Sequence, residues 1–271
     1  MINVNKASPD DEHPDADRID WEKYIFSNLV QYYRCFENGD KVHYLKENGL
    51  ELIINKSSGW PNFILGGNEI HGDNIASVVK NIVAERYPPF WIIRNDENQE
   101  QLFREHGFLL VNRWAGMGMT LKDDFPPINM LKGFSIKKAM KPDQMEHWFS
   151  VAGHVALKNH KVEFEQFRKI LPVKELLFFV GYYLDIPVSS SSLLLSDNTA
   201  GIYLVATNSS YRLHGYGTSI TEYTLRVARQ SGYQRVVLHA NPKAIHLYYN
   251  LGFRTFCDLN IFWFSPKSFK T

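Results

Sequence analysis

A polar loop that carries two glycines and leads into a helix is the feature that most restricts the fold of this chain. The loop, Arg212-Leu213-His214-Gly215-Tyr216-Gly217-Thr218, follows an apolar strand predicted over residues 201–207 and precedes a helix predicted over residues 218–230. Amides at the start of a helix have no partner within it and lie at the positive end of its dipole. The pattern therefore favours binding of a phosphate or pyrophosphate group.

Neighbouring residues exclude two better-known glycine loops. No Gly-Lys-Ser/Thr follows, so the loop is not a nucleotide-binding P-loop, and Ile220 occupies the third glycine position of the dinucleotide motif G-x-G-x-x-G. Two glycines are also compatible with an ordinary tight turn between a strand and a helix. The loop alone does not separate a phosphate site from such a turn.

A second motif follows the next predicted strand, Arg235–Ala240. Asn241 is suited to cap a helix, and Pro242 then occupies the first helical position, where proline is preferred. Gly252 is expected to end this helix and Phe253 to return the chain to the core. One face of the helix carries apolar residues at i, i+3, i+4 and i+7: Ala244, Leu247, Tyr248 and Leu251.

Together the two motifs resemble those of the GNAT superfamily of acyl-CoA-dependent N-acyltransferases. Arg212-x-x-Gly215-x-Gly217 matches the superfamily's Arg/Gln-x-x-Gly-x-Gly/Ala pyrophosphate loop. Asn241-x-x-Ala244-x-x-Leu247-Tyr248-x-x-Leu251-Gly252-Phe253 matches its second motif. The resemblance covers roughly residues 134–264 and includes the expected order of strands and helices.

The resemblance implies acetyl-CoA as the acyl donor and gives roles to particular residues. It implies that the backbone of Val205 and Thr207 pairs with the pantetheine arm, and that a backbone amide there polarises the thioester carbonyl. It places Asn241 beside the same arm and makes Tyr248 the acid that protonates the leaving thiolate. The pyrophosphate is expected to meet the charge of Arg212 and the amides of Leu213, His214, Gly215, Tyr216, Gly217 and Thr218.

Transfer to an amine also needs a base, because a primary amine with a pKa of about 10.4 is mostly protonated at pH 7. His239 is the candidate for this base, with an ordinary core or surface histidine as the alternative.

Four consecutive serines, residues 189–192, either line an acceptor groove or form a polar face of the sheet. Cys257 lies past the second motif, so we expect no covalent nucleophile and a direct attack in a ternary complex.

The placement of cysteine and histidine indicates neither a metal site nor a disulfide. Cys35 and Cys257 are far apart in the sequence and belong to no C-x-x-C or Cys/His cluster. His239 and His246 fall on different predicted elements, so we do not expect them to bind a metal together. No metal is therefore predicted.

Charge and hydropathy exclude several classes of partner. Lys and Arg number 30 and Asp and Glu 29, a net charge of +1, so we expect no nucleic acid and no anionic membrane. The longest apolar run, residues 176–184, is shorter than the ~20 residues of a membrane helix and is predicted to be a buried strand. Residues 1–19 are polar and acidic, without the apolar region of a signal peptide, so we expect a cytoplasmic protein.

The order of the predicted elements indicates an α/β or α+β fold with a mixed, mostly antiparallel sheet flanked by helices. We expect a flexible tail over residues 1–19, an N-terminal domain over residues 20–122, a linker over residues 123–133 and a catalytic domain over residues 134–265. The linker contains Asp123-Asp124-Phe125-Pro126-Pro127, which is charged and then blocked by two prolines.

The two halves of the chain end alike, which suggests an internal duplication. Gly107-Phe108 and Gly252-Phe253 lie 145 residues apart, each between a predicted helix and a strand; a helix stop followed by a core aromatic is the alternative explanation. The GNAT resemblance implies that the N-terminal half is a degenerate copy. Between Gly66 and Asp73 there is no Arg-x-x-Gly-x-Gly, and Glu69 and Asp73 would repel a phosphate, so we expect no CoA there.

The sequence therefore predicts an acetyl-CoA-dependent N-acetyltransferase of two related halves, the C-terminal one catalytic. The acceptor is expected to be a primary amine of a small molecule or peptide. The N-terminal half helps to form the acceptor pocket or serves only as a structural cap. We expect a monomer whose halves pair within the chain, with a dimer as the alternative. Two other functions stay open: a CoA-binding or regulatory module without turnover, and a structural protein without a CoA site.

Overall fold

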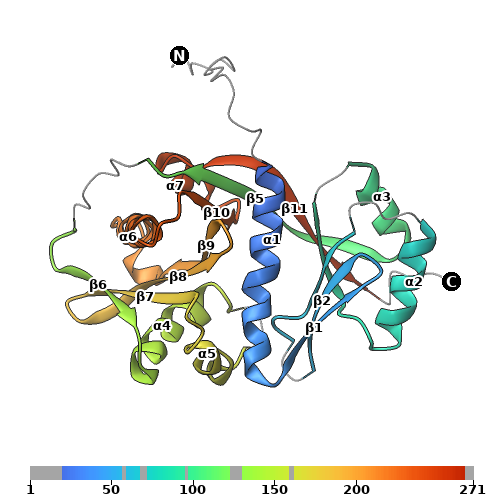
Figure 1. Ribbon diagram of the computed structural model, residues 1–271, viewed down its shortest axis with the longest axis horizontal. Helices are drawn as coiled ribbons and strands as arrows, with labels where there is room; N and C mark the ends of the chain where they lie inside the picture. Colours follow the sequence, from blue (N-terminus) through green and yellow to red (C-terminus); the bar gives the residue numbers. More distant parts are fainter. Residues whose placement is uncertain are drawn as a thin grey trace, which may run out of the picture.

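A computed structural model describes residues 20–56, 59–67, 72–94, 97–122, 130–158 and 162–265. The expected tail, the proline-blocked part of the linker and Glu69 lie outside the described residues, as does the side chain of Asp73. Within them, eleven strands form one continuous sheet (Figure 1). The strands are β1 (Val42–Glu47), β2 (Leu50–Asn55), β3 (Phe63–Gly66), β4 (Phe90–Arg94), β5 (Phe108–Thr120), β6 (Phe134–Ala139), β7 (Leu176–Tyr183), β8 (Ile186–Ser196), β9 (Thr199–Thr207), β10 (Arg235–Ala240) and β11 (Arg254–Phe264).

Helices cover both faces of this sheet. The described α-helices are α1 (Trp21–Arg34), α2 (Gly72–Val83), α3 (Glu97–Glu105), α4 (Pro142–Val155), α5 (Phe164–Ile170), α6 (Tyr216–Gln230) and α7 (Ile245–Asn250). Two short 3-10 helices, η1 (Cys35–Gly39) and η2 (Ser209–Tyr211), follow α1 and β9. None of the helices in the described ranges is long and apolar enough to cross a membrane.

The sheet is mixed and mostly antiparallel, in the order β1-β2-β3-β4-β11-β5-β10-β9-β8-β7-β6. All neighbouring strands pair antiparallel except β3 with β4 and β9 with β10. Each parallel pair is connected through a helix, α2 in the N-terminal half and α6 in the C-terminal half, as parallel strands require. The fold class predicted from the sequence is confirmed, and the same strand–helix–strand unit occurs once in each half.

The two halves exchange their final strands. β5, the last strand of the N-terminal half, lies between β10 and β11, and residues 115–120 pair with β10. β11, the last strand of the C-terminal half, lies between β4 and β5. Each half therefore supplies a strand that continues the sheet of the other.

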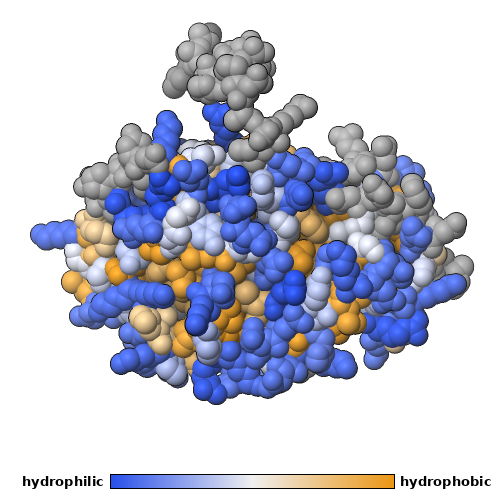
Figure 2. All heavy atoms as spheres, in the orientation of Figure 1, coloured by the Kyte–Doolittle hydropathy of each residue, from blue (hydrophilic) through white to orange (hydrophobic). Residues whose placement is uncertain are grey.

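The core has three main parts, each between the sheet and its own helices. α6 and α7 pack on one face of the C-terminal strands, while α1, α4 and α5 pack on the opposite face (Figure 1). α2 and α3 pack on the N-terminal strands. Figure 2 shows apolar residues across the middle of the viewed face, with hydrophilic residues above and below them.

Local sequence signals explain several element boundaries. Asp20 caps α1, because its Oδ1 accepts a 3.0 Å hydrogen bond from the amide of Lys23. Strand β1 was not predicted, although Asn48-Gly49 lies between β1 and β2. Both residues have positive φ, 51° and 77°, as a two-residue hairpin turn of the I′ type requires.

The second motif folds differently from its prediction. α7 spans only Ile245–Asn250, and Asn241 does not cap it. Instead, Oδ1 of Asn241 accepts from the amide of Lys243 at 3.0 Å and its carbonyl accepts from the amide of Ala244 at 2.8 Å. Asn241 thus forms a turn with its own following residues, which delays the helix by one turn.

Candidate active site

A bulge in β9 marks the centre of the candidate site. Ser190 pairs with Ala206 and Ser192 with Tyr203, so the register between β8 and β9 shifts at this point. Leu204 lies within the shift and has a φ of +49°, which is uncommon for a residue other than glycine. The bulge bends β9 and changes the direction of its following residues.

Next to the bulge, β9 and β10 cease to pair. Their parallel ladder ends at Leu238 and Ile202, although β9 continues to Thr207. The backbone of β9 beyond Ile202 therefore lacks a neighbouring strand on its β10 side. Such an edge can pair with an extended ligand. The predicted positions Val205 and Thr207 lie on this part of β9.

The glycine loop (residues 212–218) lies at the end of the same strand and opens α6. Gly215 is the N-cap, with a φ of +84° and no side-chain hydrogen bond to the helix. Leu213, also at positive φ, is fully exposed. Within the described chain, no acceptor is found for the amides of residues 213–218. The helix starts at Tyr216, earlier than predicted. The amides at its start are unpaired and are therefore able to bind an anion.

Two side chains of the glycine loop are held by the loop itself. Nε of Arg212 donates a 3.2 Å hydrogen bond to the carbonyl of Thr207, which connects the loop to the end of β9. The His214 ring stacks on Tyr216 with a centroid distance of 6.0 Å, and its Nδ1 lies 2.7 Å from the carbonyl oxygen of Arg212. Among the described residues, neither side chain forms a hydrogen bond with the amides of the loop.

Gly217 lies where three elements approach one another. A Cβ at this position would lie 3.3 Å from Oγ1 of Thr207 on β9 and 3.4 Å from Cδ1 of Leu247 on α7. The helix start is therefore close to the unpaired edge of β9 and to α7.

Tyr248 lies on α7, in the cluster that covers one face of β10. It is 7% exposed and packs edge-on against Phe253 at 5.9 Å. Burial raises the pKa of the Tyr248 hydroxyl well above its usual value. The hydroxyl therefore stays protonated at neutral pH and is able to donate. Asn241 precedes α7 and is exposed.

His239 lies on the opposite face of β10, next to the last residue that pairs with β9. Its ring lies between Tyr203, at 5.8 Å, and Trp114, at 6.4 Å. Both ring nitrogens are buried, and the backbone of Ile25 on α1 lies against the ring. Burial lowers the pKa of His239 to about 4, so the imidazole is neutral at pH 7.

Residues 143–253 match the model of the acetyltransferase (GNAT) family. These residues form a GNAT domain. GNAT proteins are generally acyltransferases that use acetyl-CoA. No curated protein sequence matches this chain.

Solved structures extend the likeness beyond the GNAT domain. A GCN5-related N-acetyltransferase from Kribbella flavida is 14% identical, with a TM-score of 0.63 over 86% of this chain and 94% of that chain. Another from Sphaerobacter thermophilus is 14% identical, with a TM-score of 0.60 over 79% and 76%. A tandem GNAT protein from the clavulanic acid biosynthesis pathway is 11% identical, with a TM-score of 0.55 over 80% of each chain. At these identities the likeness establishes the fold.

The N-terminal half differs from the GNAT domain at the corresponding strands. β3 and β4 are its parallel pair, and Trp91 on β4 is completely buried. The indole Nε1 of Trp91 donates a 2.8 Å hydrogen bond to the carbonyl of Gly66, the last residue of β3. Trp91, near the start of β4, thus binds the last carbonyl of β3, whereas β9 in the GNAT domain continues beyond its pairing with β10.

The serine run does not line a groove. Residues 189–192 are all completely buried on β8, so the expected polar sheet face is also wrong. Ser191 exchanges a 2.7 Å hydrogen bond with Thr224 of α6, and Ser192 donates to the carbonyl of Tyr203 at 3.1 Å. Hydroxyls are tolerated here because most of them bond to the backbone or to a helix.

The cysteines of the described chain are protonated thiols. Burial raises the pKa of both Cys35 and Cys257 to about 12, so neither is a thiolate at neutral pH. Within the described ranges, no group of three His, Cys, Asp or Glu side chains is placed to hold a metal ion.

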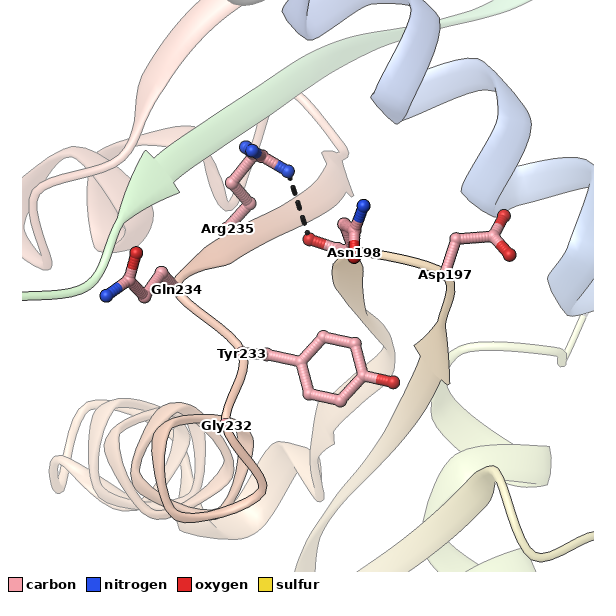
Figure 3. Close-up of a pocket in the computed structure, with 6 residues that line it drawn as sticks. All are labelled: Asp197, Asn198, Gly232, Tyr233, Gln234 and Arg235. Atoms are coloured by element: carbon pink, nitrogen blue, oxygen red, sulfur yellow. Dashed lines mark hydrogen bonds between the residues drawn. The ribbon is translucent and has the colours of Figure 1, made fainter.

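A cavity of about 360 Å³ lies at the other end of β9 and β10 (Figure 3). It is lined by Asp197 and Asn198, which precede β9, by residues 232–234, which precede β10, and by Arg235, the first residue of β10. Nη1 of Arg235 donates to the carbonyl of Asn198 at 3.4 Å, and the carboxylate of Asp197 points away from this guanidinium. The cavity is separated from the glycine loop by the length of β9.

Sequence reasoning missed Leu204, Tyr203 and Trp114. Nothing in the local sequence marks Leu204 as a bulge residue, because leucine does not favour positive φ. Trp114 belongs to the N-terminal half and reaches His239 only through the exchanged strand β5. The remaining predicted site residues all lie around the separation of β9 and β10, the glycine loop and α7.

Proposed function

We propose that this protein transfers the acetyl group of acetyl-CoA to a primary amine of a small molecule or peptide, by direct attack in a ternary complex. The observation that carries this proposal is the position of the glycine loop. The hydrogen bond from Arg212 to the carbonyl of Thr207 connects this loop to the end of the unpaired edge of β9, so one ligand with a diphosphate and an extended amide-bearing arm can meet both.

Acetyl-CoA fits these groups, and it supplies an acetyl carbonyl activated as a thioester. Amides of residues 213–218 bind the diphosphate without any side chain, and Arg212 adds a positive charge beside them. The backbone of Val205 and Thr207 pairs with the pantetheine amides, as an added strand would. Asn241 lies on the exposed turn that leads into α7, beside the expected course of the arm.

The two proton transfers are assigned to side chains that lie on opposite faces of β10. A backbone amide of β9 beside the bulge at Leu204 donates to the carbonyl oxygen as negative charge develops. Tyr248, on the α7 face, donates a proton to the departing sulfur. His239, on the α1 face, is neutral and accepts a proton from the attacking amine.

Calorimetric titration of CoA tests the proposal with a matched pair of variants. Gly215→Ala and Gly232→Ala place alanine at nearly equal φ, +84° and +89°, at the two ends of α6. Both carry a strain of about 1–2 kcal/mol. We expect only Gly215→Ala to weaken CoA binding, by tenfold or more, because its Cβ also crowds Leu131 beside the loop.

Other outcomes select the competing functions. CoA binding without thiol release across a panel of amines and peptides would indicate a CoA-binding or regulatory module. Absence of CoA binding would indicate a structural role.

We also propose that the chain acts as a monomer, because its exchanged strands already complete both halves of the sheet. Sedimentation analysis of the full chain tests this.

A further inference from the structure

We infer that Ser190, Ser192 and Asn28 are positioning residues of the acetyl-transfer site. Their side chains hold the backbone of β9 at its bulge, where the proposed function places the amide that donates to the thioester carbonyl. The inference rests on the proposed function. It also gives the N-terminal half, which supplies Asn28, a part in catalysis that needs no contact with either substrate.

The bulge needs support because its backbone has lost the regular pairing on both sides. Pairing of β9 with β10 ends at Ile202, and the register with β8 shifts between Ser190 and Ser192. Leu204 lies in this stretch with a φ of +49°. A residue in a sparsely populated backbone conformation keeps it only when the surrounding structure holds it there. The shape of β9 at the bulge is therefore set by its contacts.

Two serines of β8 hold the bulge from one side. Oγ of Ser190 donates a 3.3 Å hydrogen bond to the carbonyl of Leu204, and Oγ of Ser192 donates to the carbonyl of Tyr203 at 3.1 Å. Ser191, between them, bonds instead to a threonine of α6 at 2.7 Å. All three serines are completely buried. Because side chains alternate along a strand, two of the hydroxyls serve the bulge and one serves the helix.

Asn28 holds the residue before the bulge from α1. Its Oδ1 accepts from the hydroxyl of Tyr203 at 2.6 Å, and the ring of Tyr203 stacks on Tyr32 with a centroid distance of 3.8 Å. This approach depends on Gly201, where a Cβ would overlap Oδ1 of Asn28 and lie 2.6 Å from Cε2 of Tyr203. Tyr203 is thus fixed at its ring, its hydroxyl and its carbonyl, immediately before Leu204.

Burial leaves these side chains an indirect role in the reaction. Ser190, Ser192, Asn28 and Tyr203 are each at most 8% exposed, so they act through the backbone of β9. An amide that is held in place before the substrate binds stabilises developing negative charge without a cost of reorganisation. A hydrogen bond weakens steeply when its angle departs from linear. Loss of one supporting bond should therefore reduce polarisation of the thioester carbonyl.

The acetyl carbonyl itself can report this effect. The full-length protein is loaded with acetyl-CoA that carries ¹³C at the acetyl carbonyl, and the C=O stretch is recorded by infrared difference spectroscopy. A stronger hydrogen bond lowers this frequency. We expect Ser190→Ala and Ser192→Ala to raise it relative to the wild type, and Ser191→Ala to leave it unchanged. An unchanged band in the first two variants, or equal shifts in all three, would overturn the inference.

Turnover and CoA binding separate positioning from general destabilisation. Each of the three alanine variants loses one buried hydrogen bond, so we expect similar decreases of the urea midpoint. Thiol release is measured with the amine that the wild type acetylates fastest. We expect kcat to fall on the order of tenfold in Ser190→Ala and Ser192→Ala but not in Ser191→Ala, while the CoA dissociation constant stays within about threefold. Equal losses of kcat and CoA affinity would contradict a positioning role.

Tyr203→Phe tests the contribution of Asn28 without leaving a cavity. The variant removes the hydrogen bond to Asn28 but keeps a ring to stack on Tyr32. We expect the carbonyl band to shift in the same direction as in the serine variants, with a lower kcat. A wild-type band and kcat would overturn the role of Asn28. A wild-type protein that binds no CoA, or releases no thiol with any amine, would instead defeat the proposed function itself and the inference with it.

Discussion

The hydroxyl of Tyr203 donates a 2.6 Å hydrogen bond to Oδ1 of Asn28. Tyr203 immediately precedes the bulge of β9, whereas Asn28 lies on α1 in the other half of the chain. Nδ2 of Asn28 in turn donates to the carbonyl of Thr199, at the start of the same strand, at 3.2 Å. One buried amide from the N-terminal half thus fixes the start of β9 and the residue that precedes its bulge.

Replacing Asn28 should destabilise the whole fold. Asn28 is 2% exposed, so Asn28→Ala leaves the Tyr203 hydroxyl and the Thr199 carbonyl buried and unpaired. We expect the free energy of unfolding to fall by about 1–3 kcal/mol for each unpaired group. Urea unfolding measures this change. Asn38→Ala is the control, since Asn38 makes its hydrogen bond to Cys35 at the surface. Equal losses in the two variants would argue against a special role for Asn28.

Removing the hydroxyl of Tyr248 should slow turnover without weakening CoA binding. Acid catalysis is worth about 10²–10⁴-fold, so Tyr248→Phe is expected to lower kcat within that range. Tyr249→Phe is the control, because Tyr249 is its exposed neighbour and bonds to Thr255 at 2.8 Å. Steady-state thiol release and CoA calorimetry measure the two properties. Unchanged kcat in Tyr248→Phe would remove Tyr248 as the acid.

His239 should make the fold less stable in acid. Its pKa is about 4 in the folded chain against 6.5 in its unfolded reference, so the unfolded chain binds more protons between these values. The free energy of unfolding therefore has its full value above pH 6.5. It falls by about 3 kcal/mol in total as the pH falls toward 4 and the buried imidazole must take up a proton.

His239→Phe isolates this contribution, because it keeps a ring but removes the titration. We expect the variant to lose less stability than the wild type between pH 7 and 4, measured by urea unfolding at each pH. His246→Phe, at an exposed position on α7, should follow the wild type. Parallel curves for wild type and His239→Phe would show that burial does not act on this imidazole.

CoA should bind with a stoichiometry of one per chain. In the N-terminal half, β3 ends at Gly66, one residue beyond its last pair with β4, and the carbonyl of Gly66 already accepts from Trp91, so little unpaired edge is left for an extended ligand. Calorimetry of the wild type gives the stoichiometry, and Trp91→Phe should lower stability by about 1–3 kcal/mol while the stoichiometry stays at one. A second CoA equivalent in the wild type would show that the N-terminal half kept a site.

Features of the site that depend on local sequence could be predicted. Gly215 and Gly217 indicated a helix start with free amides, and the structure has positive φ at Gly215 and close contacts at Gly217. The strand before the loop, β9, was also anticipated from its apolar residues. The length of α7 was not, because the side chain of Asn241 competes with helix formation by bonding to its own turn.

Features that depend on distant residues could not be predicted. The positive φ of Leu204 arises from the register between β8 and β9, which no single segment encodes. The position of Trp114 beside His239 depends on β5 entering the sheet of the other half. Strand β1 is a different case, because Asn48-Gly49 is a clear hairpin signal, but the strand before it is mostly exposed and has no clear apolar alternation.

The exchange of final strands has a consequence for how the chain is made. β5 forms its ladders only with β10 and β11, and β4 gains its second neighbour only from β11. While the ribosome is still producing the central segments, both strands are open edges that other chains could join. The sheet of the N-terminal half is therefore complete only after β11 has been synthesised. A prematurely terminated chain would be prone to aggregate.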